Sequence, residues 1–255
     1  MKNELNIGVV SEGATDYTLI NEIVCSILDK DDDCLKLQPI QNGKEPGWYG
    51  VVRFCREEIQ PRGIDVFLNK VSSLPIHAVI VLVDGDQYDE STLYCAANDT
   101  RYCTKFQSLN SCYTFRTIGG GYSRCVDVPE KIKVGALPIC RRVSAMRGLV
   151  LKWCGLKQDD PKLIISIPCD MIESWIVASL ETGDQIDGRP IEEYPHIFDD
   201  YICANSSYYG WQTNLGKESF FNQFTNKVVE NWDQVRQKCP QAYRFHNDLL
   251  SLISS

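Results

Sequence analysis

The sequence contains no uninterrupted apolar run of about 18 residues, the shortest length typical of a membrane-spanning helix. Its first residues, Met1 to Glu4, lead directly into a short apolar segment and lack the longer apolar region of a secretion signal. It also has no internal repeat and no low-complexity linker. We therefore expect a cytoplasmic protein that makes no contact with a membrane.

Histidine is scarce, and no two cysteines form a C-x-x-C pair. His77, one of only three histidines, directly precedes a predicted strand, so we assign it no catalytic role. Structural zinc sites usually bring their ligands in pairs about two to four residues apart. The nearest cluster among the twelve cysteines is more widely spaced, at Cys95, Cys103, Cys112 and Cys125. Reduced, buried and unreactive thiols are therefore favoured, and a zinc site is the alternative.

Acidic residues exceed basic ones overall, but the two signs are segregated. With 26 basic and 34 acidic residues the net charge is −8, which argues against nonspecific binding of nucleic acid. Residues 101–153 hold ten basic and two acidic residues (+8), which leaves 16 basic and 32 acidic residues (−16) elsewhere. Such segregation predicts a basic face for a polyanion. The alternative is that the segment packs on the acidic remainder or on an acidic partner.

Six aromatic residues are interleaved with the cations of residues 101–153, as in surfaces that stack single-stranded or distorted nucleic acid. The segment therefore supplies our candidate nucleic-acid-binding residues. These are Arg116, Arg124, Lys131, Lys133, Arg141, Arg142 and Arg147.

Apolar runs and helical spacing alternate along the chain. The runs predict strands over residues 5–11, 35–40, 78–83 and 163–167. The spacing predicts helices over residues 15–29, 48–59, 64–73, 144–153, 170–182, 217–227, 231–239 and 242–253. This alternation indicates an α/β fold with a mostly parallel sheet flanked by helices. We expect a single domain over 1–255, with a basic Cys- and Tyr-rich insertion at about 87–143 and a helical C-terminal extension at about 183–255.

Three of the predicted strands are followed by acidic residues. Glu12 follows the first, Asp84 and Asp86 follow the third, and Asp170 and Glu173 follow the fourth. Ligands bind at the carboxyl ends of parallel strands, so these side chains are expected to converge on one edge of the sheet. Carboxylate oxygens are hard ligands suited to Mg²⁺ or Mn²⁺. We therefore predict a metal site there.

Each acidic residue also has a purely structural interpretation. Asp84-Gly85-Asp86 is a common turn sequence, and Gly85 allows a bend that would turn both aspartates toward Glu12. Asp170 is suited to capping the helix predicted after it, and Glu173 to its first turn, where the helix dipole favours an acid. Acidic residues after three strands in one chain are less readily explained by chance than any one of them alone.

Two of these motifs resemble the TOPRIM fold, the catalytic domain shared by topoisomerases, primases and nucleases of the overcoming-lysogenization-defect (OLD) type. They are Glu12-Gly13-x-Thr15-Asp16 after the first strand and Asp84-x-Asp86 after a later one. Residues 167–178, with their proline and Ile-Glu-Ser-Trp, are similar to a segment of small bacterial TOPRIM-like proteins. Residues 235–240 and Phe245 resemble the Cys-Pro-containing last helices of that group. The resemblance covers about 1–90 and 160–250.

The resemblance implies a TOPRIM/Rossmann-like sheet and a function. In TOPRIM enzymes the glutamate acts as general acid/base or metal ligand, and the Asp-x-Asp pair binds Mg²⁺. Carried over, Glu12, Asp84 and Asp86 are the catalytic residues, and with Glu173 they form the ligand set for Mg²⁺ or Mn²⁺. Asp16 stands where the family more often has glutamate; Thr15 or Asp16 can also cap the following helix.

The chain has little room for the strand-gating domains of a topoisomerase or the templating parts of a primase. The resemblance thus implies a nuclease acting on DNA or RNA, with an ATPase partner in anti-phage defence. One alternative is a catalytically degenerate sensor or regulatory subunit of an ATPase complex. A weaker one is a phosphotransferase that uses an aspartyl-phosphate at Asp84. Association into a homo-oligomer is compatible with each.

Overall fold

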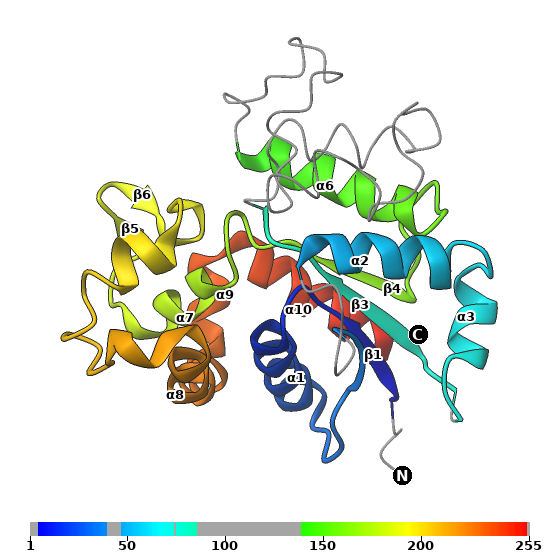
Figure 1. The fold of residues 1–255 in the computed structure, drawn as a ribbon, viewed down its shortest axis with the longest axis horizontal. Coiled ribbons are helices and arrows are strands. Elements are labelled where there is room, and N and C mark those ends of the chain that lie inside the picture. Colours follow the sequence, from blue (N-terminus) through cyan, green and yellow to red (C-terminus); the bar gives the residue numbers. More distant parts are fainter. Residues whose placement is uncertain (1–4, 40–46, 74, 86–138, 254–255) are drawn as a thin grey trace.

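The computed structural model describes residues 5–39, 47–73, 75–85 and 139–253, which form an α/β fold (Figure 1). One parallel sheet has the strand order β2-β1-β3-β4. Its strands are β1 (Ile7–Val10), β2 (Leu35–Gln38), β3 (Ala78–Leu82) and β4 (Leu163–Ser166). The predicted parallel sheet is therefore confirmed. The chain leaves β1 for β2 on one side and returns to β3 on the other, which creates a topological switch point between β1 and β3.

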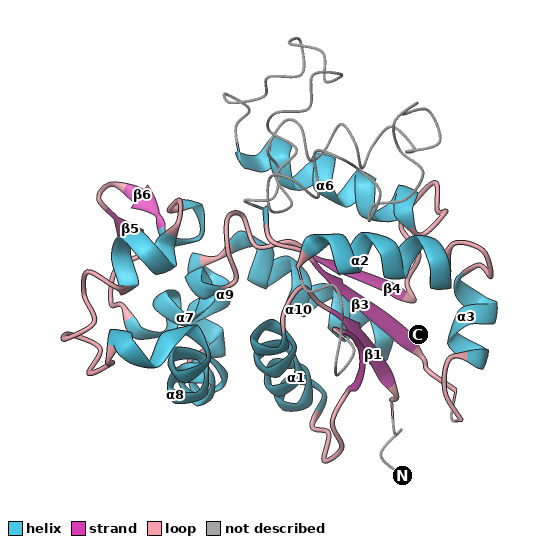
Figure 2. Ribbon diagram, in the orientation of Figure 1, coloured by secondary structure: helices cyan, strands magenta, loops and turns pink. Residues whose placement is uncertain are grey.

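The sheet is covered on both faces, as continuous apolar strands predict (Figure 2). Successive side chains of β3 point to opposite faces, so Val79 and Val81 join one apolar cluster and Ile80 and Leu82 the other. On the first face lie α2 (Trp48–Phe54), α3 (Ile64–Lys70) and α6 (Ile139–Trp153). On the second lie α1 (Ala14–Leu28) and α10 (Pro240–Ile253).

Two predicted helices on the first face differ in detail from the structure. The helix predicted over 48–59 is present, but its second half, η1 (Cys55–Ile59), is π-helical. The helix predicted over 144–153 is α6, which begins five residues earlier, at Ile139. The helical apolar pattern already includes Val143, which is buried, and Pro138 precedes the helix in sequence.

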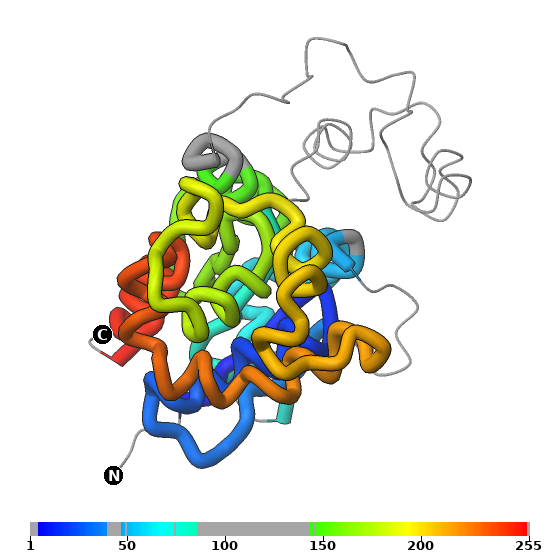
Figure 3. Tube along the Cα trace, turned by 90° about the vertical axis from the view of Figure 1, so that its left-hand side faces the viewer, coloured from blue at the N-terminus to red at the C-terminus, as the bar shows by residue number. Residues whose placement is uncertain are grey.

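The C-terminal part contains more than the predicted helices. After α7 (Glu173–Leu180), a hairpin of β5 (Gln185–Ile186) and β6 (Arg189–Pro190) lies in a segment for which the sequence predicts no strand. Short helical turns follow at η6 (Ile191–Glu193), η7 (Ile197–Ile202) and η8 (Thr213–Leu215), then α8 (Gly216–Glu230) and α9 (Trp232–Lys238). Figure 3 shows α8 running beside α1. Because α10 packs on β4, the extension completes the second layer of the sheet.

An aromatic cluster anchors α7, the helix that begins with Glu173. The Trp175 ring lies 5.7 Å from Trp232 and 5.9 Å from Phe245, centroid to centroid. Its indole N–H donates to Glu192 at 2.8 Å, so the polar edge of a fully buried ring is satisfied. None of the helices in the described ranges is both long and apolar enough to cross a membrane.

Candidate functional site

Glu12 lies at the carboxyl edge of the sheet, two residues beyond the end of β1. The Ser11 amide and hydroxyl donate to the Gln38 carbonyl at 3.0 and 3.3 Å, and the hydroxyl also lies 3.0 Å from the Gly13 carbonyl oxygen. These bonds fix the turn that holds Glu12. Its Oε1 then accepts a hydrogen bond from the backbone N–H of Asp84 at 3.0 Å. The predicted meeting of the β1 and β3 ends is therefore observed, at the switch point of the sheet.

Asp84 follows β3, and its neighbour Gly85 contacts the chain beyond β4. The Gly85 amide donates to the Pro168 carbonyl at 3.1 Å. A Cβ on Gly85 would lie 2.3 Å from the Cys169 carbonyl oxygen and 2.5 Å from that of Pro168. Residue 85 must therefore be glycine, because the two backbone segments lie too close together for a side chain. Asp84 Oδ1 accepts from the Ile172 N–H at 3.1 Å, which ties the third strand end to the start of α7.

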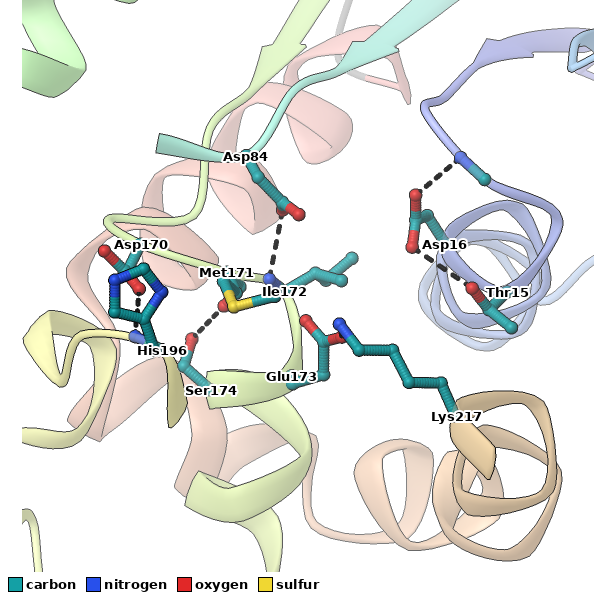
Figure 4. A network of polar contacts seen from close by, with 11 residues as sticks. Thr15, Asp16, Asp84, Asp170, Met171, Ile172, Glu173, Ser174, His196 and Lys217 are labelled. Atoms are coloured by element: carbon teal, nitrogen blue, oxygen red, sulfur yellow. Dashed lines mark hydrogen bonds and ion pairs between the residues drawn. The ribbon is translucent and has the colours of Figure 1, made fainter. Parts of the chain in front are cut away.

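Glu173, the first residue of α7, is a buried acid that pairs with Lys217 of α8 (Figure 4). Lys217 Nζ lies 3.0 Å from Glu173 Oε1, and only 4% of the Glu173 side chain is exposed. The same ammonium lies 4.6 Å from the centre of the Phe198 ring. The second oxygen, Glu173 Oε2, is buried and has no hydrogen-bond partner. A buried charge with an unsatisfied acceptor is costly, so this oxygen is available to a ligand.

Asp16 faces the same region from α1. Its Oδ2 accepts from the Gly13 N–H at 2.7 Å, and Thr15 donates to its Oδ1 at 3.4 Å. Asp16 thus satisfies the start of α1, as predicted, while Thr15 does not cap it. Burial raises the pKa of Asp16 to about 6; the negative charge of Glu173 adds to this, and the hydrogen bonds and Lys217 oppose it.

Asp170 and His196 form a separate contact beside the site. Asp170 was interpreted as a possible cap of the following helix, but that helix begins at Glu173. The buried Asp170 instead accepts from the His196 backbone N–H at 2.8 Å. His196 has a left-handed backbone conformation (φ 49°) at this contact. Asp170 therefore anchors the segment that follows the β5–β6 hairpin.

Lys217 is the cation common to this group of acids. Burial lowers its pKa, but Glu173, Asp199 and Asp84 together outweigh this, so the pKa is raised. The positive charge of Lys217 also acts to lower the pKa of Asp16. Asp16, Asp84 and Glu173 thus face one region of the described structure together with the Lys217 ammonium. Such a region attracts cations.

Sequence reasoning missed Lys217. It is the second residue of α8, where the positive end of the helix dipole disfavours a cation. A lysine at this unfavourable position indicates that an acidic residue from elsewhere in the fold stabilises it. The sequence could not identify Glu173 as that acid, because 44 residues separate the two.

The chemistry of these donors, although not their grouping, suits a divalent ion such as Mg²⁺ or Mn²⁺. All of the side-chain donors are carboxylate oxygens, and Glu173 Oε2 is an unused buried acceptor. Within the ranges that the structure describes, no three His, Cys, Asp or Glu side chains are grouped closely enough to hold a metal ion. Asp86, the third predicted ligand, lies outside those ranges.

Comparisons of the chain with protein-family models, with curated proteins and with solved structures find no match. The interpretation of the site therefore depends on its own geometry and chemistry. Those features are the Glu12–Asp84 junction, the Glu173–Lys217 pair and the unsatisfied oxygen Oε2 of Glu173.

The predicted nucleic-acid-binding residues lie mostly outside the described part of the chain, as does the cluster of Cys95, Cys103, Cys112 and Cys125. Arg141 and Arg142 belong to α6, but the structure does not describe their side chains. Outside the described ranges are Arg116, Arg124, Lys131 and Lys133.

Arg147 of α6 is described, and it has a structural role. Its side chain is 12% exposed and donates to Asp159 at 3.1 Å and to the Ile165 carbonyl at 3.3 Å. Asp248 of α10 lies 3.9 Å away. These contacts join α6 to β4 and α10, so we remove Arg147 from the proposed nucleic-acid surface.

Proposed function

We propose that the protein is a TOPRIM-type nuclease that depends on a divalent metal and hydrolyses phosphodiester bonds of DNA or RNA. The observation that most supports this is the hydrogen bond between Glu12 and the Asp84 backbone at 3.0 Å. It joins the ends of two adjacent parallel strands at the switch point, where α/β sheets bind their ligands. A glutamate and an aspartate are thereby held at one edge.

The metal would be held by Glu12, Asp84 and Asp86, with Glu173 as an additional ligand. When bound, Mg²⁺ or Mn²⁺ activates water and neutralises charge on the phosphodiester. The Asp84 and Ile172 amides each donate to one of these carboxylates, Asp84 N–H to Glu12 and Ile172 N–H to Asp84, and so fix both at the edge of the sheet. Glu12 is the general acid/base or ligand that the resemblance implies.

Lys217 supplies a positive charge beside the buried Glu173 side chain. The ammonium has a pKa above its usual value and lies on one oxygen of Glu173 only. Glu173 Oε2 could therefore bind a cation while Oε1 stays paired with Lys217. Lys217 is 43% exposed, so it can move into water if the second cation repels it.

The nucleic-acid surface and the partner are proposed from sequence. The basic side chains of residues 101–153, without Arg147, would bind the phosphate backbone. An ATPase partner and a role in anti-phage defence are implied by the resemblance alone.

A second candidate is a catalytically degenerate regulatory subunit of an ATPase complex. Lys217 favours it, because a resident ammonium is an alternative to a metal at a cluster of acids. In this case the acids stabilise the junction of β1, β3 and α7.

The deciding experiment incubates the pure protein with Mg²⁺ or Mn²⁺ and with plasmid, single-stranded DNA or RNA. Glu12→Gln and Asp84→Asn are compared with Asp65→Asn, which changes an exposed acid of α3 paired with Lys162. We expect the wild type and Asp65→Asn to cleave, and the two site variants to be inactive. Binding of the substrate should weaken steeply as salt rises, because cationic contacts release counterions.

Thermal unfolding separates the remaining outcomes. An ion present at about 100 times its Kd stabilises the folded state by about 2.7 kcal/mol. If no substrate is cut but Mn²⁺ stabilises the wild type and not Glu12→Gln, the nuclease requires its partner. If there is neither cleavage nor a metal effect, the regulatory subunit is the correct function.

A further inference from the structure

Two cysteines on the connection between α1 and β2 lie against one another. Cys25 is in the last turn of α1, and Cys34 directly precedes β2. The Asn21 side-chain oxygen accepts from the Cys34 N–H at 2.8 Å and lies 3.8 Å from Cys25 Sγ. The thiols of Cys25 and Cys34 are hydrogen-bonded to each other. Asn21 therefore links the Cys34 backbone to the Cys25 thiol, and the bond between the thiols joins the two side chains.

The surroundings of the pair fix the position of Cys34. The Tyr17 hydroxyl donates to the Cys34 carbonyl at 2.6 Å, and the Asn21 amide donates to Asp33 at 2.8 Å. Cys25 Sγ also lies 3.5 Å from the Asp32 carbonyl oxygen. Both cysteines thus belong to one network that closes the turn between the helix and the strand.

The two thiols differ in their access to solvent. Cys34 is 3% exposed, whereas Cys25 is only partly buried. A small oxidant can therefore reach Cys25 first, while Cys34 lies behind it. This is the arrangement of an attacking thiol and a resolving thiol.

The local charges place the reactive thiolate on Cys25. The hydrogen bond from Cys34 lowers the pKa of Cys25, burial opposes it, Asp33 and Glu22 oppose it further, and Lys30 assists it. The same hydrogen bond and burial raise the pKa of Cys34. Reactivity of a thiol follows its thiolate form and its exposure, and Cys25 has the advantage in both.

We propose that Cys25 and Cys34 are a peroxide-sensitive dithiol that oxidises to a disulfide. The Cys25 thiolate attacks one oxygen of a hydroperoxide and displaces the other as water or alcohol, which forms a sulfenic acid. Cys34 then attacks that sulfur, and its thiol proton and the hydroxyl group leave as water. The two thiols lose two electrons in total, and the hydroperoxide takes them up. The product links the end of α1 to the start of β2.

A second contacting pair in the core provides a matched control. The thiols of Cys55 and Cys154 are also hydrogen-bonded, between η1 and the turn after α6. Both are buried, at 0% and 1% exposure. In both pairs the two thiols are in contact, but only Cys25 is partly exposed to solvent. In the folded protein, therefore, only Cys25 and Cys34 should react with the oxidant.

The test is peptide mapping of the full chain after treatment with hydrogen peroxide and alkylation. Trypsin cuts after Lys2, Lys30 and Lys36, so the disulfide joins peptide 3–30 to peptide 31–36. We expect this linked species, lighter than the sum of its parts by two hydrogens, and its disappearance on reduction. The control link between peptides 54–56 and 153–157 should be absent.

Two variants make the result decisive. Cys34→Ala should abolish the link, leave Cys25 to oxidise further to sulfinic acid, and slow alkylation of Cys25 at neutral pH because the hydrogen bond is lost. Cys25→Ser should protect Cys34 from the oxidant. The proposal is overturned if peroxide links both pairs equally, which indicates unfolding, or if wild-type Cys25 is oxidised to sulfinic acid without any link. It is also overturned if Cys25 does not react.

Discussion

Replacement of Lys217 by methionine tests whether the acids of the site depend on one resident cation. Methionine is also unbranched and is only one atom shorter than lysine, so the change removes mainly the charge. Lys217 Nζ lies 3.0 Å from Glu173 Oε1, and Glu173 is almost completely buried. Without the ammonium, Glu173 retains one unsatisfied oxygen and gains another.

The size of the effect follows from burial. Removing one partner of a fully buried ion pair costs about 3–5 kcal/mol. Lys217 is 43% exposed, so water already screens part of the interaction, and we expect a loss of about 1–2 kcal/mol. For a chain of this size that corresponds to a fall in Tm of about 2–8 °C.

Thermal unfolding and urea unfolding measure the loss, and Lys227→Met is the control. Lys227 lies on the same helix and pairs with Glu230 at 2.6 Å, but both side chains are more than half exposed. This pair should contribute at most about 0.5 kcal/mol. Mn²⁺ should also stabilise Lys217→Met more than the wild type, because the acids have then lost their internal cation.

The reasoning is refuted if Lys217→Met is as stable as Lys227→Met. It is refuted separately if the double variant Lys217→Met/Glu173→Gln is no more stable than Lys217→Met. In a double-mutant cycle, neutralising Glu173 should recover most of the loss, since the cost arises from the unpaired carboxylate.

Two further predictions concern packing and pH. Gly85→Ala should destabilise the protein by about 1–3 kcal/mol in urea unfolding, because the new Cβ meets the Cys169 carbonyl oxygen at 2.3 Å. Gly148→Ala, in open space on α6, should instead stabilise it by about 0.5–1 kcal/mol, and equal effects of the two changes would contradict this. Burial raises the pKa of Glu192 from 4.5 to about 7, against the opposing hydrogen bonds, so the folded state favours its protonated form. About 3 kcal/mol of stability present below pH 4.5 should therefore be lost as pH rises to about 7, and Glu192→Gln should remove that part of the pH dependence. A wild type and variant with parallel pH profiles between pH 4.5 and 8 would show that Glu192 does not titrate there.

The local pattern determined the four strands of the parallel sheet, most of the long helices and which ends of the strands are acidic. Continuous apolar runs such as Ala78–Leu82 are typical of strands buried on both faces, and the structure confirms them. A parallel sheet follows from the alternation of strands with helices, so the meeting of Glu12 and Asp84 was predictable without coordinates. These features depend on the spacing of apolar residues over a few positions, which can be seen directly in a single sequence.

Only the tertiary structure decided which distant residues complete the site. Glu173 was predicted as a metal ligand, but its partner Lys217 comes from a helix that only the folded chain brings close. Asp170 was a plausible helix cap until the fold placed the His196 amide beside it. Gly85 was expected to provide a bend, whereas it permits contact between two strand ends. These outcomes depend on how helices and strand ends pack, and no local period of the sequence specifies that packing.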